Sequence, residues 1–292
     1  MVKEIRFYLL IAVIALLAVS ITACSAKKGD TGAQNTDVST TQKVDTKASE
    51  EPQATAATDN ISSNLKQPIF TNDTGKTLIQ RVSSDRNTNT SFMITSKSGA
   101  VVVVDPYLMP TKTVKTVDAI CNTHTHPDHM DELFNGEFKC RVSAAKAESF
   151  NVKDISVKSI AASHSSAPID ENAPDNLLYV FDVDGLRIVH MGDIGQDTLT
   201  PEQLKFLGKV DVAFMQFENE YSEMSLDNKK GFKLMDQLKP QIIIPTHSTT
   251  DATNKIGEIV GKLETIENTI SISKDDLKDG IRKVIDLQNT LY

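Results

Sequence analysis

One run of six residues constrains this chain more than any other feature: His124-Thr125-His126-Pro127-Asp128-His129. It directly follows the apolar segment Val117 to Asn122, which has the length and composition of a buried β-strand. The whole chain of 292 residues holds only 6 histidines, so this clustering is not expected by chance. Histidine and carboxylate are the usual protein ligands of zinc and similar divalent ions, and alternate residues at a strand end can face one ion. The run therefore predicts a metal site at the carboxyl end of a strand.

Strand-like and helix-like segments then alternate along the chain, after an opening part rich in hairpin signals such as Lys97-Ser98-Gly99 and Asp184-Gly185. This order predicts a mixed α/β domain. The expected strands are Thr77 to Val82, Ser91 to Thr95, Ala100 to Val104, Val117 to Asn122, Ile155 to Ala161, Leu177 to Val183, Leu186 to His190, Val210 to Phe217 and Gln241 to Pro245. The expected helices are Asp128 to Phe134, one capped by Thr200-Pro201, Asp227 to Leu238 and Ala252 to Glu264.

The first residues have the pattern of an export signal. Lys3 and Arg6 precede an apolar stretch from Phe7 to Ile21, shorter than the roughly 20 residues of a membrane-spanning helix. The ending Ile21-Thr22-Ala23-Cys24 resembles the lipobox of bacterial lipoproteins, in which the cysteine is lipidated and becomes the new N-terminus. We therefore expect residues 1–23 to be a signal peptide and a lipid on Cys24 to hold the protein on the extracytoplasmic face of the cell membrane. An uncleaved signal anchor is the alternative.

Residues 24–66 differ in composition from the rest of the chain. They are rich in Thr, Ser, Ala, Lys, Asp and Gln, contain no aromatic residue, and cannot bury enough apolar area to offset the entropy of ordering. We expect a disordered tether here, followed by one folded domain over residues 67–292.

The formal net charge of -8, without a basic stripe, argues against a nucleic-acid partner, because clustered Lys and Arg supply most of the affinity for phosphate backbones. Besides Cys24, the chain has Cys121 and Cys140. They fall at opposite ends of neighbouring predicted strands, beyond disulfide reach, so we expect buried free thiols.

The run from Thr123 to His129 resembles the His-x-His-x-Asp-His signature of the metallo-β-lactamase fold hydrolase superfamily. Such proteins show, in order, a later histidine, an aspartate after a glycine, and a histidine after an aliphatic strand. His164, Gly192-Asp193 and His247 meet these demands. The resemblance implies a four-layer αββα sandwich with two divalent metal ions, zinc being expected and manganese or iron possible. The implied metal ligands are His124, His126, Asp128, His129, His164, Asp193 and His247.

Within this set, the resemblance implies that His124, His126 and His164 hold one ion, that Asp128, His129 and His247 hold the other, and that Asp193 bridges them. Two metals can hold a bridging hydroxide, and Asp128 is suited to take its proton. Asp105 resembles the acidic residue that hydrogen-bonds a metal-bound histidine, the alternative being a turn-starting residue before Pro106. His190, three residues before Asp193, is expected beside the ligands rather than among them.

Several relatives are disfavoured: class B β-lactamases have a cysteine where this chain has Asp193, and the diiron branch has a glutamate where it has His126. The segment Val189 to Gly195 resembles a group of zinc-dependent hydrolases with ascorbate-phosphate lactonase-like and N-acyl phospholipase D-like members. The chain departs from that group at Glu218-Asn219-Glu220-Tyr221, where Asn219 and Tyr221 could contact substrate.

The function expected from these features is a membrane-anchored, extracytoplasmic, binuclear hydrolase of an ester, lactone, amide or phosphodiester. Its substrate would be a small molecule or derived from lipid, and the sequence leaves the oligomeric state open. The alternatives are a metal-dependent binding or sensory lipoprotein without turnover, and a structural envelope protein tethered through Cys24.

Overall fold

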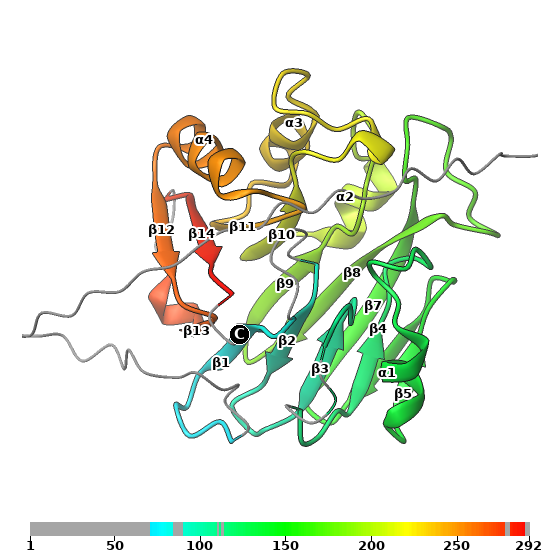
Figure 1. Cartoon of the computed structure of the whole chain (residues 1–292), viewed down its shortest axis with the longest axis vertical. Coiled ribbons are helices and arrows are strands. Elements are labelled where there is room, and N and C mark those ends of the chain that lie inside the picture. Colours follow the sequence, from blue (N-terminus) through cyan, green and yellow to red (C-terminus); the bar gives the residue numbers. More distant parts are fainter. Residues whose placement is uncertain (1–70, 84–89, 110, 112–113, 278–280, 290–292) are drawn as a thin grey trace, which may run out of the picture. The chain divides into compact units, whose positions relative to one another are not determined.

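The computed structural model of the chain describes residues 71–83, 90–109, 111, 114–277 and 281–289 (Figure 1). The predicted signal peptide, Cys24 and the predicted tether up to residue 66 lie outside these residues. Within the described part of the chain, no helix has the length and hydrophobicity needed to cross a membrane.

The described strands form two sheets. The first has the order β13-β1-β2-β3-β4-β5, antiparallel from β13 to β3 and parallel from β3 to β5. Its strands are β1 (Thr77–Arg81), β2 (Phe92–Thr95), β3 (Val101–Val104), β4 (Ala119–Cys121), β5 (Arg141–Ser143) and β13 (Thr269–Ile272).

The second sheet has the order β12-β14-β11-β10-β9-β8-β7-β6. Strands β6 to β9 pair antiparallel, whereas β9, β10, β11, β14 and β12 pair parallel. Its strands are β6 (Ser149–Val152), β7 (Ile155–Ala162), β8 (Asn176–Val183), β9 (Leu186–His190), β10 (Val212–Gln216), β11 (Ile242–Thr246), β12 (Leu263–Ile266) and β14 (Lys283–Leu287). In this sheet, β7, β9, β10 and β11 all run in one direction, so their carboxyl ends meet at one edge.

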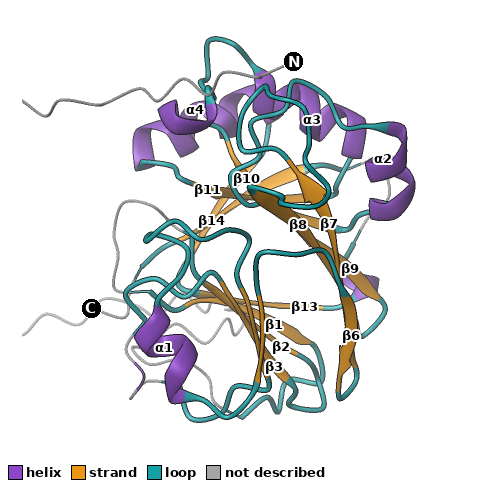
Figure 2. Ribbon diagram, turned by 90° about the vertical axis from the view of Figure 1, so that its right-hand side faces the viewer, coloured by secondary structure: helices purple, strands orange, loops and turns teal. Residues whose placement is uncertain are grey.

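Helices cover the outer face of each sheet (Figure 2). Helix α1 (Glu132–Glu137) lies on the first sheet, and α2 (Pro201–Leu207), α3 (Lys230–Leu238) and α4 (Thr250–Val260) lie on the second. Two short 3₁₀ turns, η2 (Glu220–Ser222) and η3 (Lys274–Asp276), lie in loops. Helix α2 begins as its sequence predicts: Thr200 forms a capping box with Gln203, and Pro201 occupies the first turn.

Strand β3 shows why the sheets are buried on both faces. All of its valines are buried; Val102 and Val104 join the core between the sheets, while Val101 and Val103 join a second cluster with Phe134 of α1. Strand β10 alternates in the same way between the central core and the layer of α2 to α4. Two sheets face to face with helices outside both confirm the predicted α/β class and the αββα sandwich.

Several helix boundaries differ from the predictions. Helix α1 begins at Glu132 rather than Asp128, because the Asp131 side chain caps it by accepting from the backbone N–H groups of Leu133 and Phe134. Helix α3 begins at Lys230 rather than Asp227. Helix α4 ends at Val260 rather than Glu264, because Gly261 adopts a left-handed backbone (φ 89°) and the chain turns into β12.

The cysteines lie as expected on neighbouring parallel strands. Cys121 ends β4 and Cys140 directly precedes β5, whose register pairs Cys121 with Ser143. Both thiols are free. The prediction that both are buried is wrong for Cys140, which is half-buried because it lies before a partly exposed edge strand.

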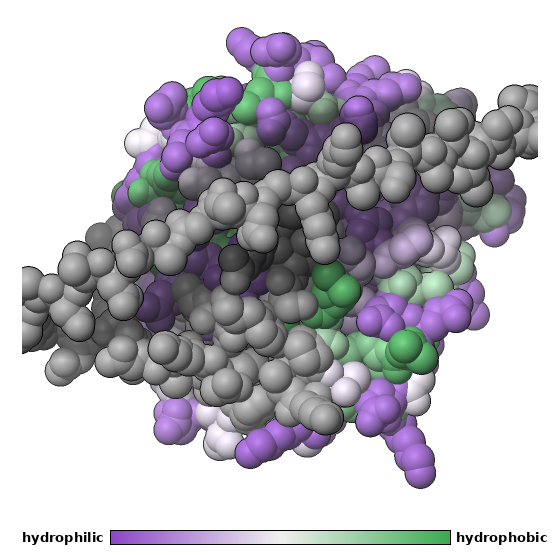
Figure 3. Space-filling view, in the orientation of Figure 1, coloured by the Kyte–Doolittle hydropathy of each residue, from purple (hydrophilic) through white to green (hydrophobic). Residues whose placement is uncertain are grey.

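Over the described residues, the face in Figure 3 is mostly hydrophilic, with hydrophobic residues in small groups. Leu133 and Tyr221 are the most exposed of the large hydrophobic residues that the structure describes, at 86% and 79%. Single exposed apolar residues of this kind are ordinary on a monomeric surface.

Candidate functional site

The predicted ligands come from loops that leave the carboxyl ends of four strands. The loop after β4 carries residues 124–129, and the loops after β7, β9 and β11 carry His164, Asp193 and His247. Because β7, β9 and β11 run in one direction, these ends meet at one edge of the second sheet, beside the end of β4. The side chains of all seven predicted ligands approach one another there, although their roles as ligands stay a prediction.

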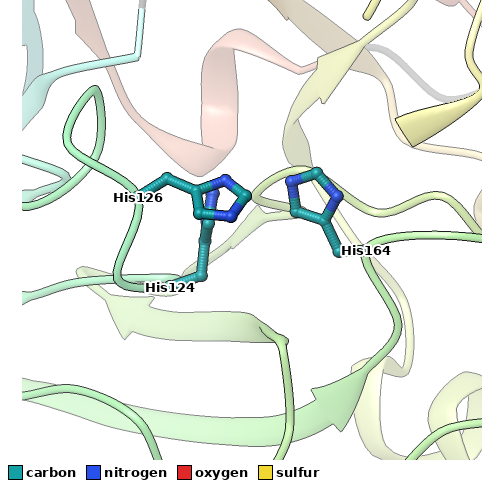
Figure 4. A group of neighbouring side chains, drawn as sticks. All are labelled: His124, His126 and His164. Atoms are coloured by element: carbon teal, nitrogen blue, oxygen red, sulfur yellow. The ribbon is translucent and has the colours of Figure 1, made fainter. Parts of the chain in front are cut away.

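His124, His126 and His164 form the first cluster. Their ring centroids lie 4.6, 4.7 and 5.1 Å apart, and Figure 4 shows the rings of His124 and His126 turned toward that of His164. His124 and His164 are buried, and the Nε2 atoms of both lack a hydrogen-bond partner among the described residues. Buried ring nitrogens without a partner are costly in a folded protein unless something binds them.

Asp128, His129 and His247 form the second cluster. The Nε2 atoms of His129 and His247 lie 2.9 Å apart. Oδ2 of Asp128 lies 3.9 Å from Nε2 of His129 and 4.0 Å from Nε2 of His247. His247 adopts a left-handed backbone (φ 44°), which a side chain other than glycine occupies only where the surroundings hold it.

Asp193 lies between the two clusters. Its Oδ1 is 3.2 Å from Nε2 of His129 and 3.0 Å from Nε2 of His247. Its Oδ2 is 3.5 Å from Nε2 of His164 and 3.9 Å from Nε2 of His124. Each carboxylate oxygen thus faces one histidine pair, which is the arrangement that a bridging ligand requires.

Charge and burial oppose each other at this centre. Burial, together with the neighbouring imidazole of His129, lowers the pKa of His124 to about 2. Burial also acts to lower the pKa of His129, but the carboxylates of Asp193 and Asp105 outweigh it and raise that pKa to about 10. Burial would raise the pKa of Asp193, yet the charge of the neighbouring His129 imidazole holds it well below its usual range.

This donor set fits divalent cations. It combines partnerless buried imidazole nitrogens, two imidazoles facing each other at close range, and a carboxylate with one oxygen on each side. Imidazole nitrogen and carboxylate oxygen are ligands that zinc, manganese and iron all accept. A cation in each cluster would make the close approach of the imidazole nitrogens favourable, because each nitrogen would direct its lone pair at the cation.

Asp105 supports the second cluster from behind. Its Oδ2 lies 2.9 Å from Nδ1 of His129 and accepts from the Thr123 hydroxyl at 2.8 Å, while its Oδ1 accepts from the Thr123 backbone N–H at 2.6 Å. An acceptor on Nδ1 directs the lone pair of Nε2 toward the centre. The carboxylate therefore orients a predicted ligand and also begins the turn before Pro106.

His190 lies outside the clusters that the described residues form. Its Nδ1 accepts from the backbone N–H of Gly192 at 3.1 Å, and its ring stacks on Phe214 in the central core. Burial lowers the pKa of His190 to about 4, so the ring is neutral at pH 7. It packs beneath the turn that presents Asp193.

Two glycines allow the backbone to approach closely at the site. A Cβ atom on Gly192 would lie 2.2 Å from Oδ1 of Asn176, which accepts from the backbone N–H of Asp193. A Cβ atom on Gly195 would lie 2.3 Å from the backbone oxygen of His164. These contacts place the Asp193 turn directly against the His164 loop.

The loop after β10, residues 218–225 (the β10 loop), makes contacts with the predicted ligands that the sequence did not identify. Asn219, predicted as a substrate contact, donates from Nδ2 to Oδ2 of Asp193 at 2.7 Å. Ser222 is fully buried beside His164, whereas Tyr221 is exposed, and its substrate contact stays a prediction. An open hollow of about 650 Å³ lies on this loop. Polar residues in a loop carry no periodic signal, so no sequence pattern could have found these contacts.

A family profile described as "Beta-lactamase superfamily domain" matches residues 87–247, more than half of the chain and a span that includes every predicted ligand. A protein named UPF0173 metal-dependent hydrolase, from Myxococcus xanthus, is 26% identical over 224 residues, covering 62% of this chain and 76% of that protein.

A solved structure shows the same fold. A Thermotoga maritima protein assigned to the Zn-dependent hydrolases of the metallo-β-lactamase superfamily matches with a TM-score of 0.55 and 20% identity, over 72% of this chain and 98% of that one. A metallohydrolase from Ignicoccus hospitalis matches with a TM-score of 0.48 and 18% identity, over 68% of this chain and 100% of that one. The chain therefore belongs to the beta-lactamase superfamily and has the metallo-β-lactamase fold.

Proposed function

We propose that this metal-dependent hydrolase holds two divalent cations and cleaves a neutral ester, lactone or amide outside the cytoplasm. The observation that carries the two-cation proposal is Asp193, because its Oδ1 lies 3.0 Å from Nε2 of His247 and its Oδ2 lies 3.5 Å from Nε2 of His164. A carboxylate that reaches two separate histidine clusters is suited to bridge two ions.

Two bound cations would supply Lewis acidity, lowering the pKa of water toward neutrality and polarising the oxygen of the scissile bond. The histidine clusters would hold them, and Asp105 would keep His129 in the right orientation. At the centre, Asp105 and Asp193 are buried, whereas the Asp128 side chain is 35% exposed. Asp128 is therefore the carboxylate that a substrate can reach, and we assign it the transfer of the proton from water to the leaving group.

The β10 loop supports a neutral substrate. Glu218 and Glu220 are among the residues that line its hollow, and Asn219 of the same loop contacts Asp193. Negative side chains beside the centre repel an anionic substrate more than a neutral one. Among the expected substrate classes, we therefore place esters, lactones and amides before phosphodiesters.

The location is proposed from the sequence. The apolar stretch from Phe7 to Ile21, followed by Ile21-Thr22-Ala23-Cys24, supports export and a lipid anchor on Cys24. The membrane would then be a partner of the protein, and a small molecule or a lipid fragment its substrate. The wild-type protein should incorporate a labelled fatty acid and Cys24→Ala should not; a wild type that takes up no label would contradict the lipid anchor.

A substrate panel tests the activity. Protein reloaded with Zn²⁺ or Mn²⁺ is assayed on lactones, acyl esters, acyl amides and phosphodiesters, with His126→Ala and metal-stripped protein as controls. We expect turnover of a neutral class that is lost in both controls. Tight binding without turnover would identify a sensory or binding lipoprotein, and full activity without metal would contradict the proposed chemistry.

A further inference from the structure

The β10 loop packs directly against two of the predicted ligands. Asn219 reaches the carboxylate of Asp193, while the Ser222 hydroxyl lies 3.1 Å from the backbone oxygen of Asp193 and 3.4 Å from Nδ1 of His164. We propose that the β10 loop is the positioning element of this half of the metal site: Asn219 orients the Asp193 carboxylate and Ser222 sets the tautomer of His164. This inference rests on the proposed two-cation function.

Asn219 is a fixed donor. Its Nδ2 donates to Oδ2 of Asp193 at 2.7 Å and to Oε1 of Gln216 at 2.9 Å, and its Oδ1 accepts from the backbone N–H of Tyr221 at 3.0 Å. Gln216 is fully buried and is itself anchored, because its Nε2 donates to the backbone oxygen of Ile194 at 2.9 Å. Both amide protons of Asn219 are thus in use, which favours positioning over substrate contact.

The hydrogen bond from Nδ2 of Asn219 restricts the orientation of the Asp193 carboxylate. A carboxylate that bridges two clusters must keep one oxygen toward each, and rotation about its Cβ–Cγ bond would remove both contacts. The hydrogen bond from Asn219 holds Oδ2 on the side of His164, and Oδ1 then remains 3.0 Å from Nε2 of His247. Such hydrogen bonds to a ligating carboxylate commonly decide how well it binds a metal.

The Ser222 hydroxyl sets the tautomer of His164 because it has a single proton to donate. A hydroxyl has one proton, and the backbone oxygen of Asp193 can only accept, so the Ser222 hydroxyl donates to it. The Ser222 oxygen is then free to accept from Nδ1 of His164, which leaves the lone pair on Nε2. That Nε2 atom is buried, lacks a partner among the described residues, and faces Oδ2 of Asp193.

The loop itself is held by other groups. The backbone of Asn219 pairs with that of Met224 through two hydrogen bonds of 2.9 Å, and Nδ2 of Asn228 donates to the backbone oxygen of Glu223 at 2.7 Å. In the hydrogen bonds of the described residues, the Asn228 side chain contacts only Glu223, Ser225 and Lys230. Asn228 touches no predicted ligand, and the two backbone hydrogen bonds between Asn219 and Met224 hold the loop without its side chain, which makes Asn228→Ala a matched control.

The test is a metal titration of the stripped full-length protein and its variants. Zn²⁺ binding is followed by calorimetry, and Co²⁺ binding by visible absorption, which reports ligand geometry independently of turnover. We expect Asn219→Leu and Ser222→Ala each to weaken one of the two binding steps roughly 10- to 100-fold and to change the Co²⁺ spectrum. Asn228→Ala should keep both affinities and the spectrum of the wild type.

Wild-type affinities and spectra in both site variants, or the same losses in Asn228→Ala, would overturn the positioning role. Circular dichroism checks that each variant is folded, and Ser222→Ala carries the test should Asn219→Leu not fold, because it removes a single oxygen atom. A wild type that binds neither ion would overturn the proposed function as well. A wild type that binds two ions with unaffected variants would overturn this inference alone.

Discussion

Nε2 of His129 lies 2.9 Å from Nε2 of His247, and Oδ1 of Asp193 is within 3.2 Å of both nitrogens. Two neutral imidazole lone pairs do not attract each other, so this contact requires a proton or a cation. His129 is oriented from behind by Asp105, which shows that the site is built around its Nε2 atom.

Metal removal should therefore lower the thermal stability of the protein. Bound ions stabilise the folded state according to their free concentration and dissociation constant, by about 4.1 kcal/mol at ~1,000 times Kd. We expect calorimetry to show a lower midpoint after chelation, restored by Zn²⁺ or Mn²⁺. In His129→Ala the restoring effect should be smaller. Equal midpoints with and without chelator would contradict a resident metal.

Asp105→Asn should weaken metal binding while leaving the fold intact. The amide keeps one acceptor oxygen for His129, but it removes the charge that stabilises that imidazole and turns its NH₂ group toward the Thr123 backbone N–H. We expect a loss of roughly 10- to 100-fold in metal affinity, measured by competition with a chromophoric chelator. Asp236→Asn, on an exposed ion pair with Arg282, is the control and should bind metal like the wild type. An unchanged metal affinity in Asp105→Asn would indicate that the Asp105 carboxylate only starts the turn before Pro106 and does not support a metal ligand.

Gly195→Ala should displace His164. The new Cβ would lie 2.3 Å from the backbone oxygen of His164 and 2.6 Å from Cα of Ser165, and backbone cannot move aside as a side-chain end can. We expect a loss of about 1–3 kcal/mol in the free energy of unfolding, together with lost metal at this half of the site. Denaturant titration and metal analysis measure the two effects.

The matched control is Gly136→Ala in α1, where a Cβ would meet open space. Because glycine is a poor helix former, we expect this change to raise the free energy of unfolding by about 0.5–1 kcal/mol, with metal content unchanged. Equal behaviour of the two variants would show that the approach of Gly195 to His164 is unimportant.

Removing charge from the β10 loop should change substrate preference. In a variant carrying Glu218→Gln and Glu220→Gln, an anionic phosphodiester should gain in kcat/KM relative to a neutral lactone, and the gain should shrink as salt is added. Competition assays at low and high ionic strength measure the ratio. If neither the substitutions nor added salt changes the ratio of the two kcat/KM values, the argument for a neutral substrate fails.

Asp286, at the end of β14, should show the opposite pH behaviour to an ordinary ion-paired aspartate. Burial raises its pKa, although Arg81 and Gln288 oppose the shift, so the folded protein holds the proton more tightly than the unfolded chain. The charged carboxylate therefore costs stability above its folded pKa, and the cost disappears as pH falls below the unfolded value of about 3.9. Asp286→Asn should raise the melting temperature at pH 7, with the gain shrinking toward pH ~4.

The contrasting control is Asp182. Burial acts to raise its pKa, but hydrogen bonds from Arg187 and Lys158 outweigh this and lower it, so its contribution to stability is present at neutral pH and is lost as pH falls through the folded pKa. Asp182→Asn should therefore lower the melting temperature at pH 7. Thermal unfolding of both variants between pH 7 and pH ~4 measures the change in melting temperature relative to the wild type. The change should have opposite signs in Asp286→Asn and Asp182→Asn. The same sign in both would contradict the opposite pKa shifts of the two carboxylates.

Much of this protein follows from its sequence. The valines of β3 and the aliphatic residues of β10 and β11 are continuous apolar runs, so burial on both faces of the sheets could be read directly. Caps such as Thr200 with Pro201 act within one turn of helix and are visible for the same reason. The spacing of His124, His126, Asp128 and His129 was informative because neighbouring ligands on one strand end are a local feature.

Other features depended on contacts between distant residues. Strand β13 pairs with β1, and β14 inserts between β11 and β12, pairings that leave no local pattern in short, partly exposed segments. Asn219 lies 26 residues from Asp193 and Ser222 lies 58 residues from His164, so only the folded chain could show that the β10 loop contacts two predicted ligands. Local periodicity and residue spacing determined the strands and the candidate metal donors. The tertiary structure decided the geometry of these donors and the contacts that support them, because hydrogen bonds between loops depend on how the sheets bring those loops together.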